Sequence, residues 1–273
     1  MRFEGTGVTD VGTYKETNQD AYLLRIAQTD ALGDVALVAV ADGMGGLAKG
    51  ELASATVIRL LAEWFESKLP LSLEAMDTSV SGFEQFVEGQ WNGIVQDLNL
   101  QIMRYGMRNK ISLGTTLTAM LAIGGRYSIV HVGDSRAYEI TDTSVVQLTE
   151  DQTFVKREID AGRLTPEEAR THPQRNVLLQ CLGASKEVRP AIIHGNLKRD
   201  ATYLLCSDGF RHVLSDDDIR EGLSWSGLGL AEGEPQRHAP ALRGALERLV
   251  DLVKQRQERD NITAVALTTE GDR

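Results

Sequence analysis

The chain has 273 residues, with 42% hydrophobic and 25% charged content, which are ordinary values for a globular protein of one large domain or at most two. Its formal net charge of −10 argues against nucleic acid as a partner. The sequence has no apolar run long enough to cross a bilayer, and its first residues lack the pattern of a signal peptide. The two cysteines, Cys181 and Cys206, lie beside apolar residues and are expected to be buried thiols. We therefore expect a cytoplasmic protein without a membrane partner.

The first part of the chain is expected to form strands whose ends carry carboxylates. Strands are predicted over residues 3–9 and 21–27, and Asp20 stands at the edge of the second. Residues 36–41 form a short, unbroken apolar run, which is typical of a strand buried on both faces. This run leads directly into Asp42 and Gly43. On this stretch alone, Asp42 is interpreted either as the cap of a following helix after a turn at 43–46, or as a ligand of a divalent metal that neutralises it.

Two long helices are predicted next. Apolar residues recur at helical spacing over residues 48–68, and Pro70 is expected to end this helix. A second helix is predicted over residues 83–107, with Trp91 on its apolar face. Such faces pack into a protein core far more often than they bind a cofactor.

The chain then changes to short strands with tight turns. Strands are predicted over residues 114–123, 127–133, 136–140 and 145–148, and Gly124-Gly125-Arg126 indicates a hairpin. Asp134 stands at another strand end. Strands linked by hairpins form an antiparallel sheet, so a parallel nucleotide-binding fold is disfavoured, and no Gly-x-Gly-x-x-Gly motif opens a helix.

The remainder contains a long polar segment, a loop rich in Gly, Ser and Pro, and two further carboxylates at strand ends. Residues 149–182 contain two predicted helices, 154–161 and 166–170, and are interpreted either as a flap over a binding site or as a solvated pair of surface helices. A strand over 201–206 runs into Asp208, and residues 222–240 indicate a loop or lid. A helix over 241–257 is followed by Asp260 and a last strand over 262–268.

Carboxylates thus flank several apolar strands: Asp42, Asp208 and Asp260 in similar settings, with Asp20 as a fourth. Each alone is typical of a turn, but strands that are neighbours in a sheet lie about 4.8 Å apart, so their ends would bring the carboxylates together. Such a cluster requires cations, and hard oxygen ligands select Mg²⁺ or Mn²⁺. Two ions about 3.5–4 Å apart could share one carboxylate and activate a water for attack on phosphorus.

At this point the motifs resemble a known family, the metal-dependent serine/threonine protein phosphatases (PPM, type 2C), and in particular its bacterial branch. The matching pieces occur in the family's order and span nearly the whole chain: Thr9-Asp10-Val11-Gly12, Asn18-Gln19-Asp20, Ala41-Asp42-Gly43-Met44-Gly45-Gly46, Gly114-Thr115-Thr116, Gly133-Asp134-Ser135-Arg136, Arg175-Asn176, Leu182-Gly183, Ser207-Asp208-Gly209 and Arg259-Asp260-Asn261-Ile262-Thr263. Any one of these pieces is weak, whereas all of them in order are very specific.

The resemblance implies an α+β fold, a four-layer α/β/β/α sandwich of two antiparallel sheets flanked by helices, with residues 1–273 as a single catalytic domain and 149–182 as its flap. It implies two Mn²⁺ or Mg²⁺ ions, with Asp42 bridging them and the carbonyl of Gly43 as a further ligand. Asp208 and Asp260 would complete one shell, and Asp20 would act mainly through metal-bound water. The substrate would be phosphoserine or phosphothreonine in proteins, a Ser/Thr kinase or its targets, and the enzyme a monomer.

Four positions depart from the family's pattern. Lys15 stands where an Arg usually holds the substrate phosphate, and because Lys lacks the planar fork we expect weaker phosphate binding. Gln19 replaces a common Glu. Ile111 stands where many bacterial members have an Asp that serves a third metal, so a standard third site is not expected. Met44 stands where other members use His as general acid, so the leaving-group proton must come from elsewhere.

Two alternatives to a general phosphatase remain open. One is a catalytically silent phosphatase-like module that signals by binding, which the intact Asp42, Asp208 and Asp260 disfavour. The other is a phosphatase that acts on one dedicated partner protein, such as an anti-sigma antagonist; it shares the chemistry and differs only in substrate.

Overall fold

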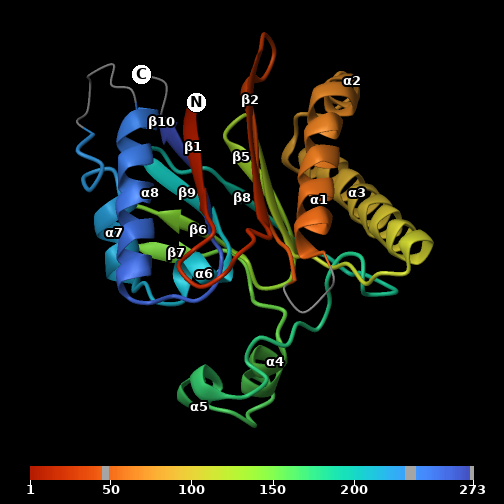
Figure 1. Cartoon of the computed structure of the whole chain (residues 1–273). Coiled ribbons are helices and arrows are strands. Elements are labelled where there is room, and N and C mark those ends of the chain that lie inside the picture. The colour runs from red at the N-terminus through yellow and green to blue at the C-terminus, as the bar shows by residue number, and fades with distance from the viewer. Residues whose placement is uncertain (45–48, 231–237, 271–273) are drawn as a thin grey trace.

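The computed structural model describes residues 1–44, 49–230 and 238–270, and within them two five-stranded antiparallel sheets lie face to face (Figure 1). The first sheet has the order β1 (Arg2–Asp10), β10 (Ile262–Glu270), β9 (Ala201–Cys206), β6 (Arg136–Ile140) and β7 (Val145–Gln147). The second has the order β2 (Asp20–Thr29), β3 (Gly33–Asp42), β4 (Leu117–Ile123), β5 (Arg126–Val132) and β8 (Ala191–Asn196).

Helices cover the outer face of each sheet. α1 (Gly50–Glu63) and α3 (Val80–Asn109) pack on the second sheet, and α7 (Asp216–Leu223) and α8 (His238–Gln255) pack on the first (Figure 1). One apolar cluster fills the space between each sheet and its helices, and a third lies between the two sheets. The predicted four-layer α/β/β/α sandwich is therefore confirmed.

Strand β3 was predicted to be buried on both faces, and it is. Its side chains alternate between two apolar clusters: Val38 and Val40 lie between the sheets, whereas Leu37 and Ala39 face α1 and α3. None of these four side chains is exposed. The continuous apolar run therefore has a simple cause, because each face of this central strand meets a different core.

The predicted end of the first helix at Pro70 is wrong. The helix continues from α1 through a π-helical turn, η1 (Trp64–Lys68), into α2 (Leu69–Leu73), and Pro70 lies at the start of α2. The first residues of a helix have no intrahelical acceptor for their N–H groups, so proline is tolerated there. The π-helical turn η1 ends α1, so the residues after it form the first turn of a new helix, α2.

Other elements were missed or placed differently. β8, α6 (Asp208–Arg211) and α7 have no counterpart among the predictions, and β8 is an edge strand whose residues are only partly buried. The predicted loop 222–240 is helical at both ends, since α7 ends at Leu223 and α8 begins at His238. Residues 231–237 of that loop, and Gly45 and Gly46 of the predicted turn, lie outside the described residues. The hairpin at Gly124 and Gly125 is confirmed, with φ angles of 56° and 81° that favour glycine.

Residues 149–182 project from one end of the sandwich and carry α4 (Phe154–Asp160) and α5 (Pro166–Thr171) (Figure 1). Threonine hydroxyls cap both helices, with Thr153 accepting from the N–H of Lys156 and Thr165 forming a capping box with Glu168. Isolated bridges Thr153↔Leu178 and Thr115↔Leu182 join the segment to itself and to the sandwich. We call residues 149–182 the flap.

Candidate metal centre and catalytic site

The four predicted carboxylates come from both sheets. Asp20 is the first residue of β2 and Asp42 the last of β3, and the two lie directly opposite each other in the strand register. Asp208 follows β9, and Asp260 precedes β10, its antiparallel neighbour in the other sheet. The strands are thus neighbours in two pairs, and the two pairs meet across the sandwich, which is an arrangement that spacing along one sheet did not predict.

The pKa of Asp42 responds to the charges of the other carboxylates. Burial raises the pKa of Asp42 well above its usual range, and the charges of Asp20, Asp208, Asp134 and Asp260 raise it further. Opposed carboxylates on neighbouring strands destabilise a sheet unless something compensates them. The fold therefore holds negative charge in one place at a cost in stability.

Asp20 shows the same effect from the neighbouring strand. Burial raises its pKa to about 7, the hydroxyls of Ser207 and Thr263 lower it, and Asp208 and Asp260 raise it. Its Oδ2 atom is buried without any hydrogen-bond partner. An unpartnered buried carboxylate oxygen among other carboxylates is the donor chemistry that suits a hard divalent cation.

Lys15 is the cation that lies among these carboxylates. Its Nζ is 3.0 Å from Oδ1 of Asp260. Although burial lowers the pKa of Lys15, the ion pair with Asp260 and the charges of Asp42 and Asp208 raise it above its ordinary value overall. Within the described residues, no three His, Cys, Asp or Glu side chains form a ready-made metal-binding group. The charges of Asp42, Asp208 and Asp260 therefore all act on Lys15.

The backbone around Asp42 is fixed by the predicted Gly114-Thr115-Thr116 motif. The N–H of Asp42 donates to Oγ1 of Thr116 at 3.0 Å, and its carbonyl accepts from the N–H of Thr116 and from Oγ1 of Thr115, each at 2.9 Å. The alternative role of Asp42 as a helix cap is not seen, because α1 begins at Gly50 with Lys49 as its N-cap and without a side-chain cap. The motif thus positions the central carboxylate.

Gly43 is required by close packing. A Cβ atom there would lie 2.4 Å from the carbonyl oxygen of Gly50 and 2.5 Å from that of Gln19. The N–H of Gly43 donates to the same Gln19 carbonyl at 3.0 Å. Only glycine lets the chain pass between these two carbonyl groups directly after Asp42.

Asp134 belongs to the cluster, although it was predicted only as a strand-end carboxylate within a family motif and was given no role at the site. It is 8% exposed, and burial together with the charge of Asp208 raises its pKa to about 7, against the opposing effect of Arg211. A signal was present in the sequence, since Asp134 follows β5 as directly as Asp208 follows β9. It was missed because that position fits a turn equally well.

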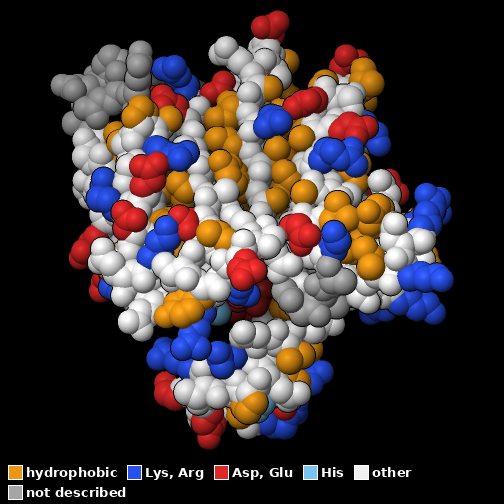
Figure 2. Space-filling model, viewed as in Figure 1, with side chains coloured by type: hydrophobic (Ala, Val, Ile, Leu, Met, Phe, Trp, Pro, Cys, Tyr) orange, Lys and Arg blue, Asp and Glu red, His pale blue; other side chains and the backbone are white. Residues whose placement is uncertain are grey.

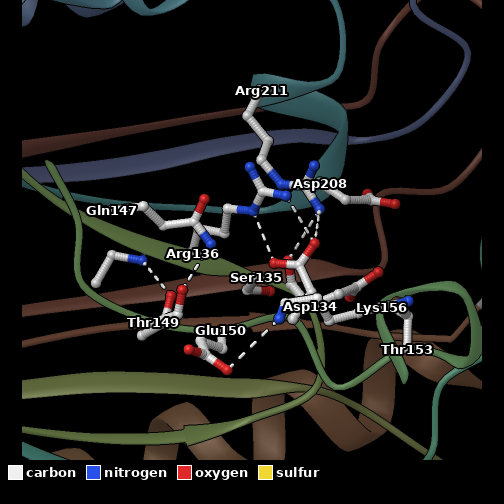
Figure 3. Close-up of polar contacts among 12 residues, drawn as sticks. Asp134, Ser135, Arg136, Gln147, Thr149, Glu150, Thr153, Lys156, Asp208 and Arg211 are labelled. Carbon is white, nitrogen blue, oxygen red and sulfur yellow. Dashed lines mark hydrogen bonds and ion pairs between the residues drawn. The ribbon is translucent and has the colours of Figure 1, made fainter. Parts of the chain in front are cut away.

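A second cluster, centred on Asp151, joins the base of the flap to the sandwich. Nε and Nη2 of Arg136 donate to the two carboxylate oxygens of Asp151 at 2.7 Å each. Nη2 of Arg211 lies 3.2 Å from Oδ2 of Asp151 and donates to the carbonyl oxygen of Asp134, also at 3.2 Å. Figure 3 shows the two guanidinium groups side by side, next to Asp134 and Asp208. This cluster links the start of the flap to the acidic site, and sequence reasoning did not identify it.

With this geometry established, comparison with known proteins decides the family. A family model described as Protein phosphatase 2C matches residues 13–247. The chain belongs to the protein phosphatase 2C family. The serine/threonine protein phosphatase PstP of Mycobacterium tuberculosis is 35% identical over 248 residues, which are 90% of this chain and 43% of PstP. The chain therefore spans less than half the length of PstP. Protein phosphatase PhpP of Streptococcus pneumoniae is 32% identical, with 78% of this chain and 81% of PhpP covered.

Solved structures agree with this family assignment. A bacterial serine phosphatase superposes with a TM-score of 0.82 at 30% identity and full coverage of both chains. The catalytic domain of PstP in complex with two manganese ions superposes with a TM-score of 0.72 at 30% identity, covering 98% of this chain and 99% of that one. The resemblance that the motifs predicted is thus confirmed.

A cleft of about 1140 Å³ opens in this phosphatase 2C chain between the flap and the sandwich, beside the acidic cluster. Lys15, Asp134 and Asp260 are among the residues that line it. Figure 2 shows this hollow with acidic side chains inside and Lys and Arg side chains along its edge. Of the two interpretations of residues 149–182, the geometry favours a flap, because the segment forms one wall of a cleft at the site.

Proposed function

We propose that this chain hydrolyses phosphoserine and phosphothreonine in proteins, using two divalent cations, Mn²⁺ or Mg²⁺. The observation that carries the proposal is the convergence of Asp20, Asp42, Asp208 and Asp260 from both sheets, with Lys15 as the cation among them. Membership of the phosphatase 2C family and the two manganese ions bound by the PstP catalytic domain support it.

Each predicted site residue has a role in this proposal. Asp42 would be shared by both ions, the carbonyl of Gly43 would bind one of them, and Asp208 and Asp260 would complete the other shell. Asp20 would support the ions from the neighbouring strand, and its unpartnered Oδ2 is free to do so. When bound, the ions would supply an activated water and neutralise charge on the phosphoryl group.

The chain's own residues would position the substrate. Lys15 lines the cleft at the acidic cluster and would contribute positive charge to the substrate phosphate. The Asp151 cluster would hold the base of the flap against the sandwich, and so fix the width of the cleft. Ile111 packs against the apolar cluster under α1 and α3, so its side chain offers no ligand to an ion.

The competing candidate is a phosphatase-like module that binds without turnover. Hydrolysis of para-nitrophenyl phosphate with and without Mn²⁺, by the wild type and by Asp42→Asn, separates the two. The proposal predicts Mn²⁺-dependent turnover that the variant loses, and then turnover of phosphothreonine peptides in preference to phosphotyrosine peptides. Absence of metal-dependent hydrolysis of any phosphoester would establish the silent module instead.

We propose a cytoplasmic location for this chain. The free, buried cysteines Cys181 and Cys206 support a cytoplasmic location, because secreted proteins tend to pair their cysteines. No helix of the described residues has the length and apolarity that a bilayer requires. We further propose that residues 1–273 act as a single catalytic domain and a monomer, with a phosphorylated protein, a Ser/Thr kinase or its targets, as substrate. Light scattering of the purified chain tests the monomer.

A further inference from the structure

The cleft beside the flap has a charge opposite to that of the whole protein. Among the described residues that line it, eight are Lys or Arg and five are Asp or Glu, which gives a formal charge of +3. The whole chain has a formal charge of −10. An excess of one sign of charge in a cleft raises the local concentration of ligands of the opposite sign. This contrast therefore points to an anionic ligand.

Most of the cations in the cleft already have a carboxylate partner. Each of five lies within 3.7 Å of one or more carboxylates: Lys15 of Asp260, Arg136 and Arg211 of Asp151, Lys156 of Asp160 and Glu150, and Arg256 of Asp218. The pairs of Asp151 join the flap to the sandwich, whereas those of Lys156 lie within the flap. They leave little charge for a ligand.

Arg170 and Arg175 are different. Both lie on the flap, at the last turn of α5 and in the chain that follows it, and both are exposed. In the part of the chain that the structure describes, neither guanidinium has a hydrogen bond, ion pair or aromatic contact. A third cation, Arg259, stacks on Tyr14, with its Cζ 5.4 Å from the centre of the ring. Arg259 directly precedes Asp260 in the sequence, and Tyr14 directly precedes Lys15. The cleft therefore has uncommitted guanidinium groups on its flap wall and a stacked one next to the acidic site.

The rest of the lining suits a peptide rather than a small anion. Val155 and Ile159 come from α4 on the flap, and Val213 and Leu214 come from the sandwich. These apolar side chains offer contacts to a polypeptide chain, and guanidinium groups bind carboxylates and phosphates through two parallel hydrogen bonds.

We propose that Arg170 and Arg175 select phosphorylated protein segments that carry a second anionic group, an acidic side chain or another phosphate, beside the phosphorylated residue. This inference rests on the proposed function and adds a sequence preference to it. The phosphate to be removed would lie at the acidic cluster and Lys15, and the second anion would lie against the flap wall.

The test compares two phosphothreonine peptides that differ only in having Glu or Gln around the phosphorylated residue. For the wild type at low ionic strength, kcat/KM with Mn²⁺ should be about five- to tenfold higher for the Glu peptide, because two exposed charge pairs each contribute modestly. The ratio should approach one in R170Q/R175Q and at high salt, which screens exposed charges. R170E/R175E should favour a Lys peptide instead.

The matched control is R104Q/R108Q, which removes two exposed arginines of α3 that do not line the cleft. It makes the same change in net charge and should keep the wild-type ratio. Binding of the same fluorescein-labelled peptides to metal-free protein, measured by anisotropy, tests the cleft without turnover. A wild-type ratio near one, or an unchanged ratio in R170Q/R175Q, would overturn the inference. Absence of Mn²⁺-dependent phosphoester hydrolysis would overturn the proposed function while the binding ratio still decides the inference.

Discussion

Asp42→Asn should make the metal-free protein more stable while abolishing its activity. The carboxylate of Asp42 lies directly opposite Asp20 in the register of β2 and β3, and Asp134, Asp208 and Asp260 add negative charge. The amide of Asn has the same shape without the charge. The substitution therefore removes repulsion without leaving a cavity, and it also removes the central ligand of the proposed metal site.

The size of the gain follows from the distance between the charges. Residues directly opposite on antiparallel strands have Cβ atoms about 5 Å apart, and two unit charges at about that distance repel by about 3 kcal/mol at an effective dielectric constant of about 20. Lys15 and proton uptake by the cluster reduce this cost. We expect the free energy of unfolding in EDTA at pH 8 to rise by about 1–3 kcal/mol.

The raised pKa of Asp42 also determines how this gain in stability changes with pH. Because the folded state raises the pKa of Asp42 above its unfolded value of 3.8, the penalty is absent below about pH 4 and grows as the pH rises. The gain from Asp42→Asn should therefore be large at pH 8 and small near pH 4. Urea unfolding in EDTA at both pH values measures it.

Added Mn²⁺ should have the opposite effect on the stabilities of the two proteins. Mn²⁺ at 100 times its dissociation constant should stabilise the wild type by about 2.7 kcal/mol and leave Asp42→Asn unchanged. Asp97→Asn, at an exposed position of α3, is the control for net charge and should have neither effect. If Asp42→Asn were less stable than the wild type in EDTA, or if Mn²⁺ stabilised both proteins equally, this explanation would be wrong.

Four further predictions follow from the same contacts. Asp151→Asn should lower the free energy of unfolding by about 2 kcal/mol, because Arg136 loses its bidentate partner; an unchanged urea midpoint would contradict this. Gly43→Ala should cost about 2 kcal/mol through its clash with neighbouring carbonyl groups and weaken Mn²⁺ binding in calorimetry, whereas wild-type affinity would count against the role of this glycine. Burial lowers the pKa of His131 to about 4, so between about pH 6.5 and 4 only the unfolded chain takes up this proton. The free energy of unfolding should therefore fall by up to about 3 kcal/mol as the pH is lowered through this range, and an NMR titration midpoint of His131 near 6.5 would exclude this effect. Lys15→Arg should lower KM for a phosphopeptide, since the guanidinium fork fits phosphate better, and an unchanged KM would remove the expected effect of this departure.

Single elements could be predicted from the sequence because local patterns record burial, whereas the four-layer arrangement was predicted from the family resemblance. The unbroken apolar run of β3 indicates a strand with a core on each side, and Gly124-Gly125 permits the positive φ angles that a tight hairpin turn requires. Pro70 was misread because the sequence does not show a π-helical turn before it, which makes the position a helix start instead of an end. Edge strand β8 was missed because its partial burial leaves no clear alternation.

The site could be predicted in part. Aspartates at strand ends are visible in the sequence, but the meeting of Asp20 and Asp42 with Asp208 and Asp260 across the sandwich depends on how two sheets face each other. Contacts such as those of Asp151 join residues far apart in the chain and leave no local signal. The family resemblance supplied what local patterns could not, because its motifs preserve the tertiary arrangement.

The most direct test of the central claim is a crystal structure of the chain with Mn²⁺, phased at a wavelength where manganese scatters anomalously. We predict two anomalous peaks beside Asp42, with Asp208 and Asp260 at one of them and Lys15 displaced from Asp260. A map without peaks in this cluster at saturating Mn²⁺, with the Lys15–Asp260 ion pair intact, would contradict it.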